Sequence, residues 1–164
     1  GRQMGGKKVY TNPKLGGSIL FGTTWRGFIK KDKETDKFIM KKINDKDGLY
    51  ETKVMTDFPE LEDVFNEFGD LYFKDFEFTH VQINKNFKCK PHFDKSNMGD
   101  STLISIGNFM GGTTGVDFDT CTEYLNSHNT PVKFDGSMYR HWVEPFAGER
   151  YSLVFFNSKS LSGV

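Results

Sequence analysis

The sequence predicts a mostly β fold, closed as a sandwich or barrel, with one clear helix. Three observations predict this class: short runs rich in β-branched and aromatic residues, glycine turns between them, and only one window with helical apolar spacing. The runs expected as strands are 18–22, 38–40, 76–84, 101–107, 116–119, 138–143 and 150–156. Many short strands with little helix between them are typical of sandwiches and barrels.

One helix is expected after Asp57, which is a favourable N-cap, and Pro59 falls near its first turn. Apolar residues then recur on a single helical face, namely Leu61, Val64, Phe65 and Phe68. Acidic residues occupy the opposite face, and Gly69 is expected to end the helix. The stripe predicts a helix that packs across the outside of a sheet.

The chain of 164 residues is expected to form one domain, 18–164, behind a flexible N-terminal arm, 1–17. The arm is rich in glycine and lysine and contains Asn12-Pro13, so we expect it to be loosely docked. The charged stretch 30–37 is expected as a hairpin tip, and the polar stretch 121–129 as a loop.

The composition excludes several classes of protein. Two cysteines, Cys89 and Cys121, are too few for the disulfide framework of a small secreted domain, so an intracellular setting is expected. No run approaches the roughly 18 apolar residues that a membrane span requires. The 22 basic residues balance the 22 acidic ones, so net charge does not indicate a partner.

The charges are distributed unevenly along the chain. Residues 1–42 contain 11 basic and 3 acidic residues, whereas residues 43–77 contain 3 basic and 11 acidic ones. A basic front segment is compatible with a surface that holds a polyanion such as nucleic acid. Solvated lysines that flank a hairpin account for the same pattern and are the ordinary explanation, and both interpretations stay open at this point.

From Phe76 the pattern changes to strict alternation. His80, Gln82 and Asn84 share one face of the expected strand, and apolar side chains occupy the other. Buried polar groups require partners, so the polar row either lines a cofactor cavity or faces solvent. Alternation alone favours the solvent face, with Val81 and Ile83 buried on the other side.

The segment Pro91-His92-Phe93-Asp94 has the strongest chemical signal. Residues two apart on an extended segment share a face, so His92 and Asp94 are able to bind one cation together. His141 is the best third ligand, because it precedes an extended run and a tight reversal. Two imidazoles and one carboxylate with open positions are the ligand set of non-haem iron(II) oxygenases.

A second pair of residues follows at the same spacing of two. Arg150 and Ser152 are expected on one face of the returning strand. Arginine grips a carboxylate with two parallel charge-assisted hydrogen bonds, and the serine hydroxyl adds a third. A metal with free positions beside an anchored arginine suits a 2-oxo diacid.

The chain resembles the Fe(II)/2-oxoglutarate-dependent dioxygenases over about residues 58–156, and it looks closest to compact TET/JBP-like oxygenases of protists, algae and large viruses. The matching motifs are Pro91-His92-Phe93-Asp94 with Asn97 and Gly99, Gly107-Asn108-Phe109 with Gly111-Gly112, Phe134-Asp135-Gly136, His141, and 145–154. The resemblance implies a double-stranded β-helix (jelly-roll or cupin-like) with one or two helices packed outside.

The resemblance also implies roles for single residues. His92, Asp94 and His141 would bind Fe(II). Arg150 and Ser152 would hold the distal carboxylate of the co-substrate 2-oxoglutarate, which Asn84 would face. Dioxygen would be consumed, succinate and CO2 released, and a C–H bond hydroxylated. The methyl group of 5-methylcytosine or thymine in nucleic acid is the substrate implied first. A prolyl hydroxylase, an AlkB-like demethylase and a catalytically inactive β-barrel binding module are the alternatives.

Four other residues have competing interpretations. Tyr139 and Trp142 flank His141 and would either stack on a flipped base or pack in a wall. His80 is expected either near the site or as a hydrogen-bonded structural histidine. His128 lies in a polar loop, where solvation is expected.

Overall fold

The computed structural model describes residues 16–25, 27–31, 38–42 and 49–159, with side chains described for 16–23 and 51–159. The strands are β1 (Gly17–Trp25), β2 (Gly27–Lys31), β3 (Phe38–Lys42), β4 (Leu49–Glu51), β5 (His80–Lys85), β6 (Asn97–Gly111), β7 (Thr114–Asp117), β8 (Thr122–Leu125), β9 (Val132–Phe134), β10 (Arg140–Val143) and β11 (Phe146–Ser158). The helices are α1 (Lys53–Asp57) and α2 (Glu60–Tyr72). Most of the predicted arm, residues 1–15, lies outside the described residues.

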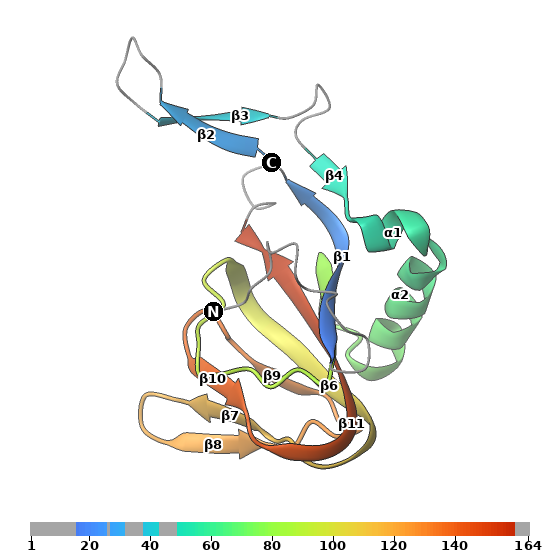
Figure 1. The fold of residues 1–164 in the computed structure, drawn as a ribbon, viewed down its shortest axis with the longest axis vertical. Coiled ribbons are helices and arrows are strands. Elements are labelled where there is room, and N and C mark those ends of the chain that lie inside the picture. Colours follow the sequence, from blue (N-terminus) through green and yellow to red (C-terminus); the bar gives the residue numbers. More distant parts are fainter. Residues whose placement is uncertain (1–15, 26, 32–37, 43–48, 160–164) are drawn as a thin grey trace.

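The strands form a jelly-roll of two facing sheets, which confirms the predicted mostly β fold. The larger sheet has the order β4-β1-β5-β11-β6-β9 and the smaller one has the order β10-β7-β8. In Figure 1 the helices lie on one side of the long strands, and β7, β8 and β10 lie on the other. The hairpin of β2 and β3 extends beyond the end of β1. Of the predicted tip at 30–37, residues 30 and 31 belong to β2 and residues 32–37 lie outside the described residues.

Alternation along β11 divides the molecule into an inner and an outer layer. Val154 points between the sheets, where it packs with Leu103, Val116 and Phe134. Its neighbour Phe155 points the other way, into the cluster beneath the helices. Because successive side chains of a strand face opposite sides, one strand supplies both the barrel interior and the outer core.

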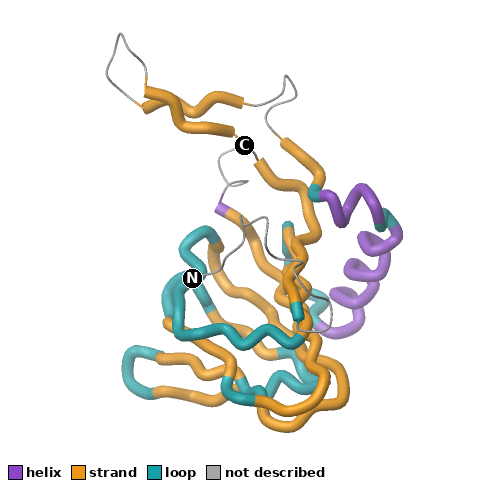
Figure 2. The backbone as a smooth tube through the Cα atoms, in the orientation of Figure 1, coloured by secondary structure: helices purple, strands orange, loops and turns teal. Residues whose placement is uncertain are grey.

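The outer core is an aromatic cluster centred on Phe155, which is fully buried. Four other phenylalanine rings lie within 6 Å of the Phe155 ring, namely Phe65, Phe68, Phe73 and Phe78. Figure 2 shows that the helical segment covers this face of the sheet from a single side. The helices therefore anchor the outside of the barrel, as the apolar stripe predicts.

The predicted helix boundaries were wrong at both ends. Asp57 ends the short helix α1, and α2 follows with Pro59 as its N-cap. Gly69 does not end α2, which continues to Tyr72. The added methyl of a larger residue at Gly69 would lie 3.3 Å from the Phe78 ring, so the glycine provides close packing rather than a stop signal.

Two strand predictions also need correction. The stretch 121–129 was expected as a loop, yet β8 pairs with β7 over Thr122–Leu125. β8 is the edge strand of its sheet and its side chains are mostly exposed, so it forms without the alternating apolar pattern. β6 begins at Asn97, where a turn was expected, and runs for 15 residues. Among the described residues, no helix has the length and apolar character needed to cross a membrane.

Candidate metal centre and buried arginine

Backbone pairing brings the three predicted metal ligands together from two distant segments. His92 and His141 form an antiparallel bridge in which each backbone N–H donates to the other's carbonyl oxygen at 3.0 Å. The backbone N–H of Asp94 donates to the carbonyl of Gly136 at 2.8 Å. The segment 92–94 is therefore fixed against both β10 and the loop that precedes it.

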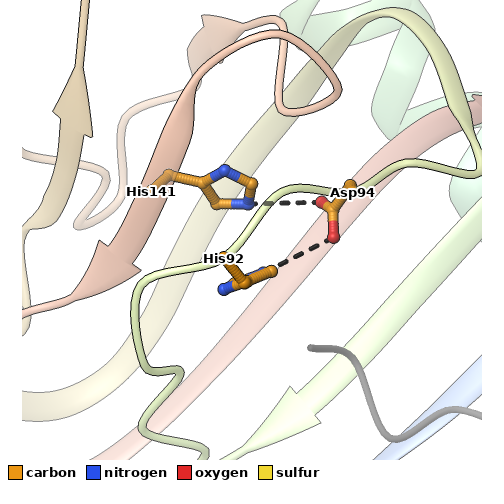
Figure 3. Close-up of side chains that lie close together, drawn as sticks. All are labelled: His92, Asp94 and His141. Carbon is orange, nitrogen blue, oxygen red and sulfur yellow. Dashed lines mark ion pairs between the residues drawn. The ribbon is translucent and has the colours of Figure 1, made fainter.

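The three side chains converge on one point. Nε2 of His92 lies 3.4 Å from Oδ1 of Asp94, and Nε2 of His141 lies 3.3 Å from Oδ2 of the same carboxylate. One ligand atom from each residue can be chosen so that all three lie within 4.8 Å of one another. Figure 3 shows both imidazoles turned toward the carboxylate. Asp94 and His141 are buried, and His92 is partly exposed.

The donor set fits a divalent iron ion. Nδ1 of His92 donates to the carbonyl of Lys90 at 2.6 Å, and Nδ1 of His141 donates to the carbonyl of Tyr139 at 2.9 Å. Since Nδ1 carries the proton in each ring, each Nε2 presents a lone pair toward Asp94. An ion about 2.1 Å from two ligands at a right angle separates them by about 3 Å, close to the observed spacings.

Arg150 lies inside the barrel on β11, opposite Gly107 of β6. Its side chain is 2% exposed and its guanidinium lies 5.6 Å from the ring centroids of both Phe109 and Phe146. Gly112 makes room for it, because a Cβ there would lie 3.0 Å from Nε of Arg150. The Arg150 side chain is thus enclosed by the rings of Phe109 and Phe146 and by the backbone of Gly112.

The enclosed guanidinium has unmet hydrogen-bonding capacity. Nε and Nη2 of Arg150 are buried and have no hydrogen-bond partner among the described residues. Burial lowers the pKa of Arg150, and the negative charge of an ionised Cys89 opposes that shift. A buried charge with unused donors is costly, so this site is suited to an anionic ligand that accepts from both nitrogens.

Ser152 lies two residues further along β11, on the same inner face as Arg150. It pairs with Asn84 on one side and with Ser105 on the other. Nδ2 of Asn84 donates to Oγ of Ser152 at 3.1 Å, and Oγ of Ser18 donates to Oδ1 of Asn84 at 2.5 Å. Asn84 thus lies in the barrel wall, where it orients Ser152.

The polar row on β5 faces the barrel interior rather than solvent. His80 and Gln82 are 1% and 2% exposed, which rules out the solvent-face interpretation. Nδ1 of His80 lies 2.7 Å from Oγ1 of Thr79, and its ring stacks on Phe156, so it is a structural histidine. Nε2 of Gln82 donates to Oγ of Ser18 and to the carbonyl of Ile19.

The sequence interpretation missed further buried polar groups. The side chain of Asn97 is 1% exposed, and neither Nδ2 nor Oδ1 has a hydrogen-bond partner among the described residues. Its backbone N–H donates to the carbonyl of Asp94 at 2.9 Å, so its backbone lies beside that of one predicted metal ligand. Oγ of Ser101 and Oγ1 of Thr114 are likewise buried, and neither has a hydrogen-bond partner among the residues that the structure describes. As a turn residue, Asn97 carried no signal of burial.

Trp142 and Tyr139 do not line the site. Trp142 pairs with Gly115 on the face opposite His141, lies against that glycine, and donates through Nε1 to Glu144. Tyr139 packs against Phe118. These contacts support the interpretation in which both residues pack in a wall of the barrel.

His128 is not a solvated loop residue. Its Nε2 lies 3.0 Å from the carbonyl of Gly107, and its ring lies 4.1 Å from that of Phe109. The histidine thus packs beside one of the two rings that enclose Arg150.

No protein-family model and no curated protein matches the sequence. Among solved structures, the chain is similar to a 2OG-Fe(II) oxygenase family oxidoreductase from Burkholderia pseudomallei, with 23% identity over 66% of this chain and a TM-score of 0.50. It is also similar to NgTET1 in complex with 5mC DNA, with 17% identity over 87% of this chain and a TM-score of 0.52. The chain spans 60% of the length of the first structure and 61% of the length of the second. It therefore has the double-stranded β-helix fold in which 2OG-Fe(II) oxygenases are built.

Proposed function

We propose that this chain is an Fe(II)/2-oxoglutarate-dependent dioxygenase that hydroxylates a substrate C–H bond. One observation carries the proposal: a set of two imidazoles and one carboxylate shares a barrel interior with a buried arginine, two of whose nitrogens have no hydrogen-bond partner among the described residues. A structural salt bridge would have paired that arginine with an acid. A diacid co-substrate accounts for both features together.

In this proposal each residue has a defined task. His92, Asp94 and His141 hold the iron, and the Lys90 and Tyr139 carbonyls keep Nε2 of each imidazole unprotonated and directed at it. Arg150 and Ser152 bind the distal carboxylate of 2-oxoglutarate, with Asn84 holding Ser152 in place. Bound iron would supply the reaction of dioxygen with 2-oxoglutarate and the C–H bond, which yields succinate, CO2 and an alcohol.

We further propose a pyrimidine methyl group in nucleic acid as the substrate. The segment 85–95 leads into the metal site and contains four lysines, Lys85, Lys88, Lys90 and Lys95. Its one acid, Asp94, is buried with the ligands, while Phe87 and Phe93 are exposed. Lysines that alternate with exposed aromatic rings suit phosphates and unstacked bases. The basic front segment, 1–42, falls largely outside the described side chains and adds no support.

Asn97 supports a base as the substrate. A carboxamide presents one donor and one acceptor side by side, which is the pattern that reads the edge of a base. The Asn97 carboxamide is buried, its two polar atoms have no hydrogen-bond partner among the described residues, and its backbone N–H donates to the Asp94 carbonyl, which is compatible with such a ligand. NgTET1, which has the same fold, is described in complex with 5mC DNA, and this is compatible with the proposal.

Co-substrate turnover tests the reaction. The purified chain with Fe(II), ascorbate and 2-oxoglutarate should form succinate, and His92→Ala should not, because it lacks one ligand. Equal succinate from both proteins would defeat the enzyme proposal.

The substrate is tested separately. Oligonucleotides with 5-methylcytosine or thymine, and proline-containing peptides, are incubated with the protein and analysed by mass spectrometry of nucleosides and peptides. A gain of one oxygen on a pyrimidine supports the nucleic-acid proposal, whereas hydroxyproline would replace it with the prolyl alternative. Oligonucleotide binding should also weaken steeply with salt, with a slope that decreases when Lys88 and Lys90 are changed to glutamate.

A further inference from the structure

Gly136 is the residue of the loop before β10 that lies against the metal ligands. Its carbonyl accepts the backbone N–H of Asp94 at 2.8 Å. A Cβ at this position would lie 3.0 Å from Cε1 of His141, 3.2 Å from Oδ2 of Asp94 and 3.5 Å from Nε2 of His141. A single methyl group would therefore crowd two of the three ligand residues at once.

The glycine is not explained by its backbone conformation. Gly136 is absent from the described glycines with positive φ, so an L-residue can adopt its backbone conformation. The requirement is one of space. Gly136 differs in this respect from Gly107 and Gly112, whose positive φ values of +118° and +71° favour glycine.

The loop around Gly136 has little freedom to move away from the ligands. Oδ1 of Asp135 accepts from the backbone N–H and hydroxyl of Ser137, at 2.9 and 2.5 Å, and from the N–H of Met138 at 3.2 Å. The carbonyl of Asp135 accepts from the N–H of Tyr139 at 3.0 Å. A side chain at 136 would thus push on Asp94 and His141 before the loop yields.

We propose that Gly136 is a positioning residue of the metal centre. Its missing side chain lets the Asp94 carboxylate and the His141 imidazole turn toward the same ion, and the Asp135 turn keeps that space fixed. This inference rests on the metal site proposed above and adds a residue that does not itself contact the ion.

Cobalt(II) binding tests the inference without turnover. The metal-free full chain is titrated with Co(II), and affinity is measured by calorimetry together with the visible absorption spectrum. Gly136→Ala should weaken Co(II) binding by about tenfold to a hundredfold, as disturbed outer contacts of metal sites do. Its melting temperature in EDTA should match wild type, because the methyl group conflicts with the ligand arrangement and not with the core.

Two further variants sharpen the result. Gly69→Ala in α2 also adds a tightly packed methyl, which would lie 3.3 Å from the Phe78 ring, and it should leave Co(II) affinity unchanged. Asp135→Ala combined with Gly136→Ala should bind Co(II) more tightly than Gly136→Ala alone, because the loosened turn can retreat, yet more weakly than Asp135→Ala. If Gly136→Ala does not fold, the comparison of the double variant with Asp135→Ala carries the test.

Two results would overturn the inference. One is a Co(II) affinity of Gly136→Ala within twofold of wild type, and the other is equal affinity of the double variant and Asp135→Ala. Neither would touch the proposed metal site, which stands or falls on whether wild type binds Co(II) and His92→Ala does not.

Discussion

Replacing Arg150 with methionine should weaken co-substrate binding without lowering the stability of the fold. Arg150 is 2% exposed between the rings of Phe109 and Phe146, and two of its nitrogens have no hydrogen-bond partner among the described residues. Methionine is of similar length, apolar, and favourable against aromatic rings. Arg150→Met therefore removes a binding group and a buried charge together.

The size of each effect follows from these contacts. A charge-assisted hydrogen bond contributes about 1.5–3 kcal/mol, so loss of the two-pronged contact should cost about 3 kcal/mol of 2-oxoglutarate binding. That corresponds to an affinity about a hundredfold weaker. Without co-substrate, removing an uncompensated buried charge should leave the free energy of unfolding unchanged or raise it by about 1 kcal/mol or more.

Thermal unfolding with and without 2-oxoglutarate measures both effects in one assay. At a 2-oxoglutarate concentration of about 100 times the wild-type Kd, wild type should gain about 2.7 kcal/mol and Arg150→Met only about 0.4 kcal/mol. Arg140→Met is the matched control, because Arg140 is exposed and pairs with Asp117. Unchanged 2-oxoglutarate affinity together with a large loss of stability in Arg150→Met would refute the reasoning and make Arg150 a structural residue.

Three other outcomes are expected. Asn84→Ala releases the Ser152 hydroxyl and should weaken 2-oxoglutarate binding severalfold, by about 1 kcal/mol, measured by calorimetry. Phe155→Ala, in the aromatic cluster beneath the helices, should lose about 3–5 kcal/mol of unfolding free energy in urea, with Co(II) affinity retained in the folded fraction. Hydrogen bonds from Thr122 and Arg140 lower the pKa of Asp117 from 3.8. The ionised carboxylate therefore stabilises the fold above pH 3.8, and this contribution is lost as the pH falls through the lowered pKa. Thr122→Val should raise that pKa, measured by NMR titration.

Local patterns predicted the elements whose signal repeats within a few residues. The spacing of two places His92 and Asp94 on one face, and Arg150 and Ser152 on another, and both placements are found in the structure. The apolar stripe predicted the packing face of α2 at Leu61, Phe65 and Phe68, because helical periodicity depends only on neighbours within a turn or two. It was wrong at Val64, which is 52% exposed and does not pack against the core. Helix boundaries were predicted less reliably. Gly69 was expected to end the helix, but the glycine is required because the Phe78 ring packs close to it.

The residues that the sequence interpretation missed are those whose role depends on distant partners. Nothing local distinguishes Asn97 from an ordinary turn asparagine, because its burial comes from the closure of the barrel around it. The same holds for β8, an edge strand held by pairing with β7. Strand alternation by itself favoured the solvent face for the row from His80 to Asn84, and this was wrong because either face of a strand can be the buried one.

The sequence by itself determined the chemical groups and their local facing: two histidines, one aspartate, and an arginine with a serine two residues later. Only the tertiary structure decided what surrounds them. The bridge between His92 and His141 joins segments 49 residues apart, and the bare backbone of Gly136 lies beside them. Side-chain direction is a property of consecutive residues, whereas burial and free space depend on which segments the closed sheets bring together.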